Sequence, residues 1–204
     1  VFVAGGGQIP FVTRPPTQAM RIIDLLRHTS GLTYGFQERS PVDAAQRKSG
    51  LENWRKMDDD SFIAELAKLP LEFDPGSCWN YSVSTDVLGV IVARVSGQSL
   101  GDYFAEHIFG PLGMTDTGFA VPKDQAHRLP DCYTYDPAAK MKLIDPAGPE
   151  STWAGAHSFQ SGGGGLASTL RDYHRFSRML LNGGALDGQQ VISPKTLDLM
   201  TANH

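Results

Sequence analysis

The strongest helical pattern in the chain lies between Ser84 and Gly97. Apolar residues recur there at helical spacing and form one stripe of a helix, namely Val87, Leu88, Ile91, Val92 and Val95. Ser84 is a suitable N-cap because its hydroxyl can accept a bond from an amide of the first turn, and Gly97 can adopt the left-handed conformation that ends many helices. The pattern therefore predicts a buried helix that begins shortly after Tyr81.

Similar signals predict further helices before and after this one. Each pairs an apolar stripe with a capping residue at its start and a glycine or proline at its end. The expected helices run from Thr17 to Gly31, over Pro41–Ser49 with a Ser40–Asp43 capping box, from Asp60 or Ser61 to Pro70, from Ser99 to Gly110 and Pro111, from Ser168 or Thr169 to Gly183 and Gly184, and from Ser193 to about Thr201. The faces predicted to be buried include Ile22 and Leu26 on the first helix, and Leu170 and Tyr173 on the helix after Thr169.

Three other segments lack helical periodicity. Alternating tyrosines predict a short strand or hairpin near Asp131–Ile144. The four glycines Gly162–Gly165 let the backbone approach a ligand or another segment closely, and they could equally form a hinge. Gly5–Gly7 predicts an extended or flexible N-terminal stretch.

These elements predict a mainly α-helical fold with a few short strands, organised as a single domain over residues 1–204. The apolar fraction of 41% and the charged fraction of 20% are ordinary for a soluble globular protein. A net charge of −4 without a basic run disfavours a nucleic-acid partner. The longest apolar stretch, Val87–Val95, is too short to span a bilayer.

Cysteine and histidine usage indicates neither a disulfide framework nor a metal site. Cys78 and Cys132 could form a single bridge, although two free thiols are favoured. The six histidines show no metal-binding spacing, so no metal and no other cofactor is expected. His28 lies near the end of a predicted helix, where its ring can bind loop carbonyls, and we predict a structural role for it.

Tyr81 is the residue most suited to chemistry. It lies between a turn at Pro75 and Gly76 and the predicted buried helix, which would anchor the phenol without covering it. The alternative is a tyrosine that only fills the surface of the domain. Trp54 is an isolated aromatic residue among charged ones, and we expect it to pack against the next helix rather than to line a substrate entrance.

Four segments occur in the order found in a known group of serine hydrolases. They are LLRHTSGL at Leu25–Leu32, PG followed by YSV at Tyr81–Val83, IFGPLGMTDTGF at Ile108–Phe119 and GGGGLASTLRDYHRF at Gly162–Phe176. Together they resemble the class C β-lactamases, DD-peptidases and family VIII carboxylesterases, from about Ile22 to Met200. The resemblance implies the helical lobe of a β-lactamase/transpeptidase-like α+β fold.

In that group, a Ser-x-x-Lys pair supplies the nucleophile, and a tyrosine that matches Tyr81 supplies the base. No serine of this chain is followed by lysine three residues later, and no G-x-S-x-G elbow is present. Lys195 and Thr196 are followed by Leu197, so the Lys-Thr-Gly element is also missing. We therefore expect an interior fragment of a longer enzyme, which carries the tyrosine but not the nucleophile and is inactive alone.

The resemblance also implies how Tyr81 would work. A free phenol has a pKa of about 10 and is a poor base at neutral pH. A neighbouring ammonium lowers the pKa of a phenol, and the lysine of the missing Ser-x-x-Lys would supply that ammonium. Tyr81 would then take the proton of the nucleophile on acylation and assist attack by water or alcohol on deacylation.

The substrate is predicted from residues that match the acyl pocket of relatives. β-Lactamases and DD-peptidases carry an asparagine two residues after the tyrosine, whereas Val83 stands here and favours esters over amides. Phe159, Gln160 and Gly164 match a stretch that borders the pocket. We predict a carboxylesterase acting on a small-molecule ester. A β-lactamase or DD-peptidase and a non-catalytic binding lobe are the alternatives, and self-association through surface exposed by truncation is a further expectation.

Overall fold

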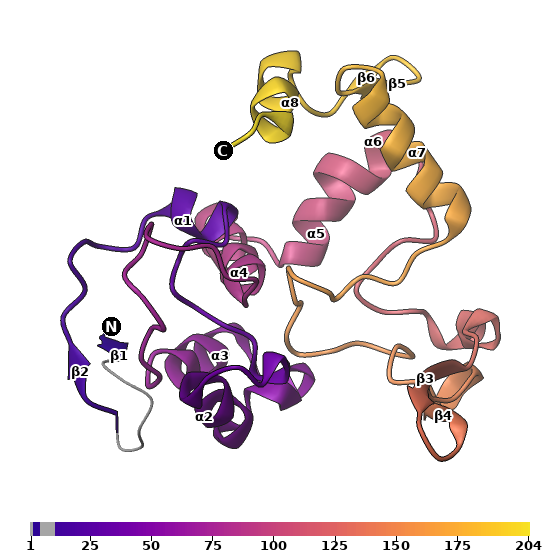
Figure 1. Ribbon diagram of the computed structural model, residues 1–204. Coiled ribbons are helices and arrows are strands. Elements are labelled where there is room, and N and C mark those ends of the chain that lie inside the picture. Colours follow the sequence, from indigo (N-terminus) through magenta and orange to yellow (C-terminus); the bar gives the residue numbers. More distant parts are fainter. Residues whose placement is uncertain (1, 5–10) are drawn as a thin grey trace. The chain divides into compact units, whose positions relative to one another are not determined.

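The computed structural model describes residues 2–4 and 11–204 (Figure 1). The contacts between residues divide the chain into two compact units. Unit 1 comprises Val1–Leu100, Ser158–Gly165 and Asn203–His204, and unit 2 comprises Gly101–His157 and Leu166–Ala202. The single domain over residues 1–204 stays a prediction, and the stretch Gly5–Gly7 lies outside the described residues.

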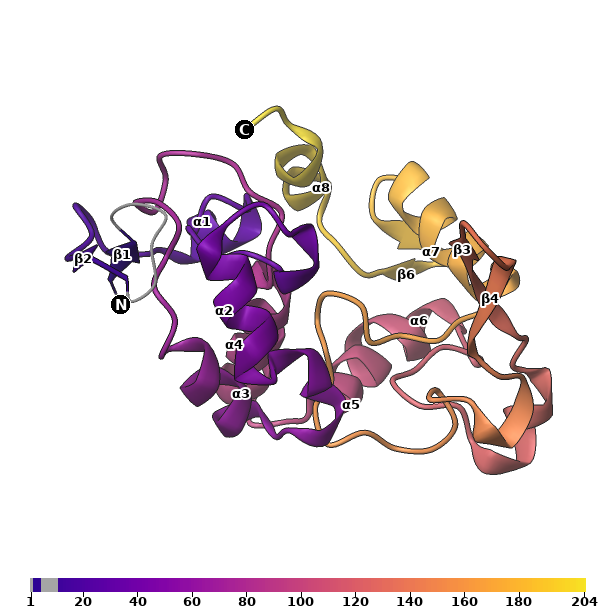
Figure 2. The same ribbon diagram turned by 60° about the horizontal axis from the view of Figure 1, so that its bottom comes forward.

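Unit 1 combines helices with one small sheet. Its elements are β1 (Val3–Ala4), β2 (Thr13–Arg14), α1 (Ile22–Leu26), the 3-10 helix η1 (Gly35–Gln37), α2 (Pro41–Ser49), the 3-10 helix η2 (Leu51–Lys56), α3 (Asp59–Leu66) and α4 (Ser84–Ser96). β1 and β2 pair antiparallel, and α1 packs against α4 (Figures 1 and 2). The loop that carries the glycine run returns to this unit and covers part of α4.

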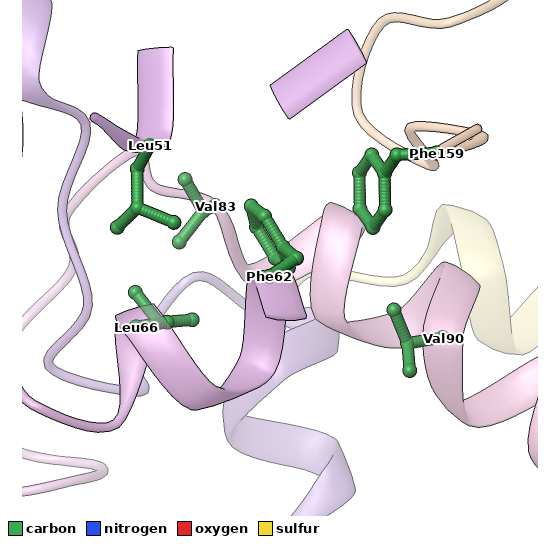
Figure 3. Close-up of a cluster of buried hydrophobic side chains, with 6 residues drawn as sticks. All are labelled: Leu51, Phe62, Leu66, Val83, Val90 and Phe159. Atoms are coloured by element: carbon green, nitrogen blue, oxygen red, sulfur yellow. The ribbon is translucent and has the colours of Figure 1, made fainter. Parts of the chain in front are cut away.

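The hydrophobic core of unit 1 is centred on α3 and α4. Figure 3 shows its buried side chains, which are Leu51, Phe62, Leu66, Val83, Val90 and Phe159. Phe159 stacks on Phe62 with ring centroids 4.4 Å apart. Because Phe159 belongs to the loop Ser158–Gly165, this contact anchors the glycine run to the core.

Helix α4 confirms the predicted helix and its end at Gly97, which has a φ of 71°. The N-cap is Val83 rather than Ser84, because the Ser84 hydroxyl is already bonded to two other buried serine hydroxyls. The predicted apolar stripe is only partly correct. Val95 is 83% exposed, whereas Asp86 lies on the buried face because its carboxylate binds the glycine loop.

Three predicted helix starts are confirmed. The capping box Ser40–Asp43 starts α2, and its C-cap Gly50 has a φ of 82°. Thr169 caps α7 and Ser193 caps α8 through bonds from the amides three residues on.

Two helix starts in unit 1 differ from the prediction. Helix α3 is capped by Asp58, whose carboxylate accepts a bond of 2.7 Å from the amide of Ser61. Helix α1 begins after Arg21 instead of Thr17, because Arg21 and Asp24 form the cap and an ion pair there. This five-residue helix turns Asp24 and Leu25 inward. Ile22 and Leu26 are consequently 57% and 61% exposed, so the prediction that they are buried is wrong.

Unit 2 contains a helical run with a π-helical turn in it, a longer helix and two hairpins. Its elements are α5 (Leu100–Phe104), which begins on the last residue of unit 1, the π-helical turn η3 (Ala105–Phe109), α6 (Gly110–Leu112), the 3-10 helix η4 (Lys123–Arg128), β3 (Cys132–Asp136), β4 (Lys140–Asp145), the 3-10 helix η5 (Gly148–Glu150), α7 (Leu170–Leu181), β5 (Ala185–Leu186), β6 (Gln189–Gln190) and α8 (Pro194–Thr201). Its core consists of Phe109, Leu112, Met114, Met179 and Leu186. The antiparallel pair β3–β4 confirms the hairpin predicted near Asp131–Ile144.

The helix predicted to end at Gly110 and Pro111 continues to Leu112. Proline has no amide hydrogen and clashes with the carbonyl four residues earlier in a regular α-helix. The chain widens into a π-helical turn just before Pro111, with the Gly110 amide bonded to the carbonyl of Ala105. The run ends at Gly113, which has a φ of 62°.

The buried face of α7 also differs from the prediction. Leu170 and Tyr173 are 87% and 64% exposed, whereas Asp172 and Met179 are buried. The carboxylate of Asp172 accepts bonds from the Asp116 amide and the Thr117 hydroxyl, at 2.7 and 2.9 Å. These bonds turn the polar position inward and leave the apolar neighbours outside.

The fold class is mainly α, with 44% helix and 12% strand among the described residues. Cys78 and Cys132 are both exposed and free. Within the described part of the chain, no helix combines the length and apolar character needed to cross a membrane.

An ion pair fixes the segment before α1 and supplies a pH test of the structure. Arg14 binds both carboxylate oxygens of Asp74, at 2.9 and 2.5 Å, and the Thr17 amide adds a bond of 2.8 Å. The Arg14 guanidinium holds the pKa of Asp74 down at about 2. The unfolded chain ionises this carboxyl at about pH 3.9. The contact therefore stabilises the fold above that pH, and the contribution is lost as the pH falls towards 2.

We expect an NMR titration of the Asp74 carboxyl to show this low midpoint. Arg14→Gln should raise the midpoint towards the value of the unfolded chain, because the guanidinium is its main cause. An unchanged midpoint in Arg14→Gln would show that the ion pair does not exist in solution.

Candidate active site

Tyr81 lies just before α4 and combines anchoring with access to solvent. Its side chain is 44% exposed. The rings of His28 and Tyr34 each pack against it with centroids 5.1 Å away. Its carbonyl accepts a hydrogen bond from the side-chain amide of Gln37. The phenol is therefore held by neighbouring rings and remains open to a reaction partner.

A pocket of about 410 Å³ opens beside Tyr81. Its walls are mainly aromatic and apolar and include Tyr34, Phe36, Trp54, Tyr81, Val83 and Gly164. The described lining residues include no lysine or arginine. An ammonium partner for Tyr81, which the family resemblance implies, therefore has to come from outside this set.

Asp86 organises the inner wall of the pocket. The residue is only 6% exposed, and its carboxylate accepts a bond of 2.8 Å from the Tyr34 hydroxyl. The other oxygen accepts bonds from the Ser161 hydroxyl and, at 3.3 Å, from the Gly163 amide. One side chain of α4 thus fixes both the start of η1 and the glycine loop.

Tyr34 donates to Asp86 and keeps its proton. Burial of the phenol, together with the negative charge of Asp86, raises the pKa of Tyr34 far above its ordinary value. Tyr34 is consequently a fixed neutral donor next to Tyr81, and its ring continues the aromatic wall by stacking on Phe36 at 4.9 Å.

The structure brings together only some of the predicted site residues. Val83, which is 4% exposed, and Gly164 line the pocket with Tyr81. Phe159 is buried in the core instead, and Gln160 lines a separate groove near the end of α4. The roles of these residues in binding, and of Tyr81 in catalysis, stay predictions.

Sequence reasoning missed Tyr34, Asp86 and Ser161 as pocket residues. The only local signal is Asp86, a carboxylate among apolar helix positions, which also suits the positive end of a helix dipole and so does not stand out. Trp54 is expected from the sequence only to pack, yet it both lines the pocket and contacts Phe159 edge-on at 6.1 Å. Tyr34 has no distinguishing pattern, because its contact with Asp86 joins positions that are far apart in sequence.

His28 lies one residue beyond the C-cap of α1 and against the ring of Tyr81. It adopts the left-handed conformation with a φ of 55°. Its Nδ1 lies 3.3 Å from both the amide and the hydroxyl of Ser82, and its carbonyl accepts a bond of 2.8 Å from the Asn80 amide. Burial lowers the pKa of the imidazole, which favours its neutral form. Among the described residues, no histidine, cysteine or carboxylate group has an arrangement suited to a metal ion.

Comparison with known proteins finds a matching family and several relatives in sequence. Residues 8–204 match the family described as Beta-lactamase. Protein Rv1367c of Mycobacterium tuberculosis is 42% identical over 188 residues, which cover 92% of this chain and 45% of that protein. Lovastatin esterase of Penicillium rubens is 32% identical over 192 residues, covering 93% and 46%.

The fold of this chain is also similar to that of solved structures. A mutant of simvastatin synthase, LovD from Aspergillus terreus, superposes with a TM-score of 0.72 at 28% identity, over 97% of this chain and 44% of that one. The chain spans about half the length of the curated relatives it matches.

Proposed function

Because the chain belongs to the beta-lactamase family of serine hydrolases and acyltransferases, we propose that the whole protein hydrolyses small carboxylic esters through an acyl-enzyme, with Tyr81 as the general base. The observation that carries the proposal is the accessible Tyr81 phenol beside an apolar, aromatic pocket. Rv1367c shares much of this sequence, and the relative named lovastatin esterase supports ester chemistry.

The proposed reaction assigns Tyr81 two proton transfers in each half. In acylation, its phenolate takes the proton of the serine hydroxyl while the serine oxygen attacks the ester carbonyl, and the proton then passes to the departing alkoxide. In deacylation, it takes a proton from water, whose oxygen attacks the acyl carbon, and returns the proton to the serine oxygen. The serine and its lysine belong to the Ser-x-x-Lys element, which this chain does not contain.

Val83 supports an ester over an amide. Its side chain is buried in the pocket wall and can neither donate nor accept a hydrogen bond. An amide substrate brings an N–H and a strongly polar carbonyl, and burying them against an apolar wall leaves polar groups without partners. An ester has no N–H to satisfy. Transfer of the acyl group to an alcohol instead of water is the second candidate, supported by the likeness to proteins described as acyltransferases or as having acyltransferase activity.

Substitution of Val83 tests the substrate class. We expect the full-length protein to turn over p-nitrophenyl butyrate and to act poorly on a chromogenic cephalosporin. Val83→Asn should raise the cephalosporin-to-ester ratio of kcat/KM by about threefold to tenfold, the value of one added hydrogen bond. Val83→Ala is the control, because it removes the same packing without adding an amide and should leave the ratio unchanged.

Two outcomes would contradict the proposal. Efficient cephalosporin hydrolysis without ester turnover by the unmodified protein would indicate a β-lactamase. A full-length sequence without Ser-x-x-Lys would indicate a non-catalytic lobe.

A further inference from the structure

His28 binds the chain on both sides of Tyr81. Its backbone carbonyl accepts the amide hydrogen of Asn80, the residue before the tyrosine, at 2.8 Å. Its imidazole Nδ1 faces the amide of Ser82, the residue after the tyrosine, at 3.3 Å. The imidazole ring also packs on the Tyr81 ring. One residue therefore fixes the backbone that carries the phenol and supports the phenol itself.

The left-handed conformation of His28 makes this double contact possible. Non-glycine residues rarely adopt a positive φ, although histidine and asparagine do so more often than most. With a φ of 55°, His28 turns the chain sharply after α1. The strain of this conformation is tolerated because the carbonyl and the side chain both gain partners on the Tyr81 segment.

A chain of buried serine hydroxyls continues from His28 into the protein. The Ser82 hydroxyl lies 3.3 Å from His28 Nδ1 and 2.7 Å from the Ser84 hydroxyl, which in turn lies 2.7 Å from the Ser30 hydroxyl. All three serines are fully buried. Each hydroxyl has a single proton to donate, so the direction of the chain depends on the protonation of the imidazole.

Only an unprotonated Nδ1 satisfies every donor in this chain. Ser30 then donates to Ser84 and Ser84 to Ser82, while the Ser82 hydroxyl and the Ser82 amide share the single lone pair of Nδ1, each at 3.3 Å. A proton on Nδ1 reverses the chain, removes the acceptor of the Ser82 amide, and leaves the Ser30 hydrogen without an acceptor among the described groups. Buried donors without partners are costly, so the surroundings select a neutral ring with its proton on Nε2.

We propose that His28 is a positioning residue for Tyr81, which holds the tyrosine segment only while its imidazole is neutral and releases the Ser82 amide when it is protonated. The inference rests on the proposed function only for its effect on turnover. The contact itself is a property of this chain.

Two opposing pairs of charged groups and one further arginine lie on the segments that carry or contact His28. Asp24 of α1 pairs with the N-cap Arg21, and Arg39 and Glu72 both bind the side-chain amide of Asn80. Arg27, beside His28 in the sequence, lies 3.3 Å from Nδ1 of the His204 ring. Tyr81 is the titratable group in ring contact with the imidazole. Burial, rather than any of these charges, is what lowers the pKa of His28.

NMR of the isotope-labelled chain tests the inference without requiring turnover. Long-range ¹H–¹⁵N spectra should show an unprotonated Nδ1 and a protonated Nε2 for His28, with a titration midpoint below the usual value of about 6.5. The Tyr81 ring resonances should shift with the same midpoint. The reverse tautomer, or Tyr81 resonances that stay constant through the His28 titration, would overturn the proposal.

Two substitutions separate the hydrogen bond from the titration. His28→Asn keeps an acceptor near the position of Nδ1 and tolerates the left-handed conformation, so the Ser82 amide should stay protected from hydrogen exchange. Because asparagine does not titrate, the shift of the Tyr81 ring resonances at acidic pH should disappear. His28→Ala should speed exchange of the Ser82 amide by about fivefold relative to the Asn80 amide, whose acceptor is a backbone carbonyl. His174→Asn, on the exposed side of α7, is the control and should change neither. Unchanged Ser82 exchange in His28→Ala would contradict the proposal.

In the full-length protein, kcat should decrease at acidic pH, and the midpoint of this decrease should coincide with the titration midpoint of His28. The decrease should be absent in His28→Asn. If Tyr81→Phe leaves turnover unchanged, the proposed function fails, whereas the NMR coupling between His28 and Tyr81 still decides this inference.

Discussion

Replacement of Tyr81 by phenylalanine in the full-length protein is expected to lower kcat for p-nitrophenyl butyrate by about 10²–10⁴-fold, the usual contribution of a positioned general base. The change removes one hydroxyl and keeps the ring that packs on His28 and Tyr34. The side chain is 44% exposed, so the fold should be little affected. KM should change much less than kcat, because the lost proton transfer belongs to the transition state.

A matched control is Tyr173→Phe, which removes a hydroxyl from a 64% exposed tyrosine of α7. It should leave kcat unchanged. Circular dichroism and thermal unfolding of both variants would show whether any loss comes from misfolding. A Tyr81→Phe enzyme with normal kcat and a normal fold would exclude Tyr81 as the base.

The 204-residue chain alone provides a second control, after its intact mass has been verified. It should not turn over p-nitrophenyl acetate or butyrate, because it contains no Ser-x-x-Lys pair. Turnover by the chain that is lost in Tyr81→Phe would mean that another of its residues acts as the nucleophile.

The success of the sequence predictions follows the range of the interactions involved. The caps Ser40, Thr169 and Ser193 are predicted correctly because a cap joins residues three apart, which a short segment reveals. The mainly helical class is predictable for the same reason. Tertiary contacts decide the buried face of α7, where Asp172 turns inward to bind Asp116. The predicted starts of α1 and α3 are wrong although their caps are local, because several nearby residues could serve as the cap.

The residues of the candidate site also divide into those that one short segment reveals and those that only long-range contacts bring together. Tyr81 and Val83 can be singled out because they belong to one short segment of the family resemblance. The partnership of Tyr34 with Asp86 could not be predicted, since it joins residues 52 positions apart through one hydrogen bond. The resemblance puts Phe159 near the acyl pocket, yet its ring is needed in the core against Phe62.

The glycine loop is the part of the site where a single added methyl group should have the largest effect on stability. A Cβ at Gly162 would lie 2.4 Å from the backbone oxygen of Thr85 and 3.2 Å from the Cα of Gly89. Both obstacles are backbone atoms of α4 and cannot rotate away. Gly162→Ala is therefore expected to lower the free energy of unfolding by about 3 kcal/mol, which is typical of strong overpacking. Urea unfolding of the chain measures this loss.

Gly164→Ala is the matched control two residues further along the same loop. A Cβ there meets nothing within 4 Å, so the free energy of unfolding should change by less than about 1 kcal/mol. The difference between the variants isolates the contact with α4 from any general effect of stiffening the loop. The same contact keeps the Gly163 amide against Asp86, so Gly162→Ala should also disturb the pocket wall beside Tyr34. Equal stability of the two variants would show that the loop does not pack on α4 in solution.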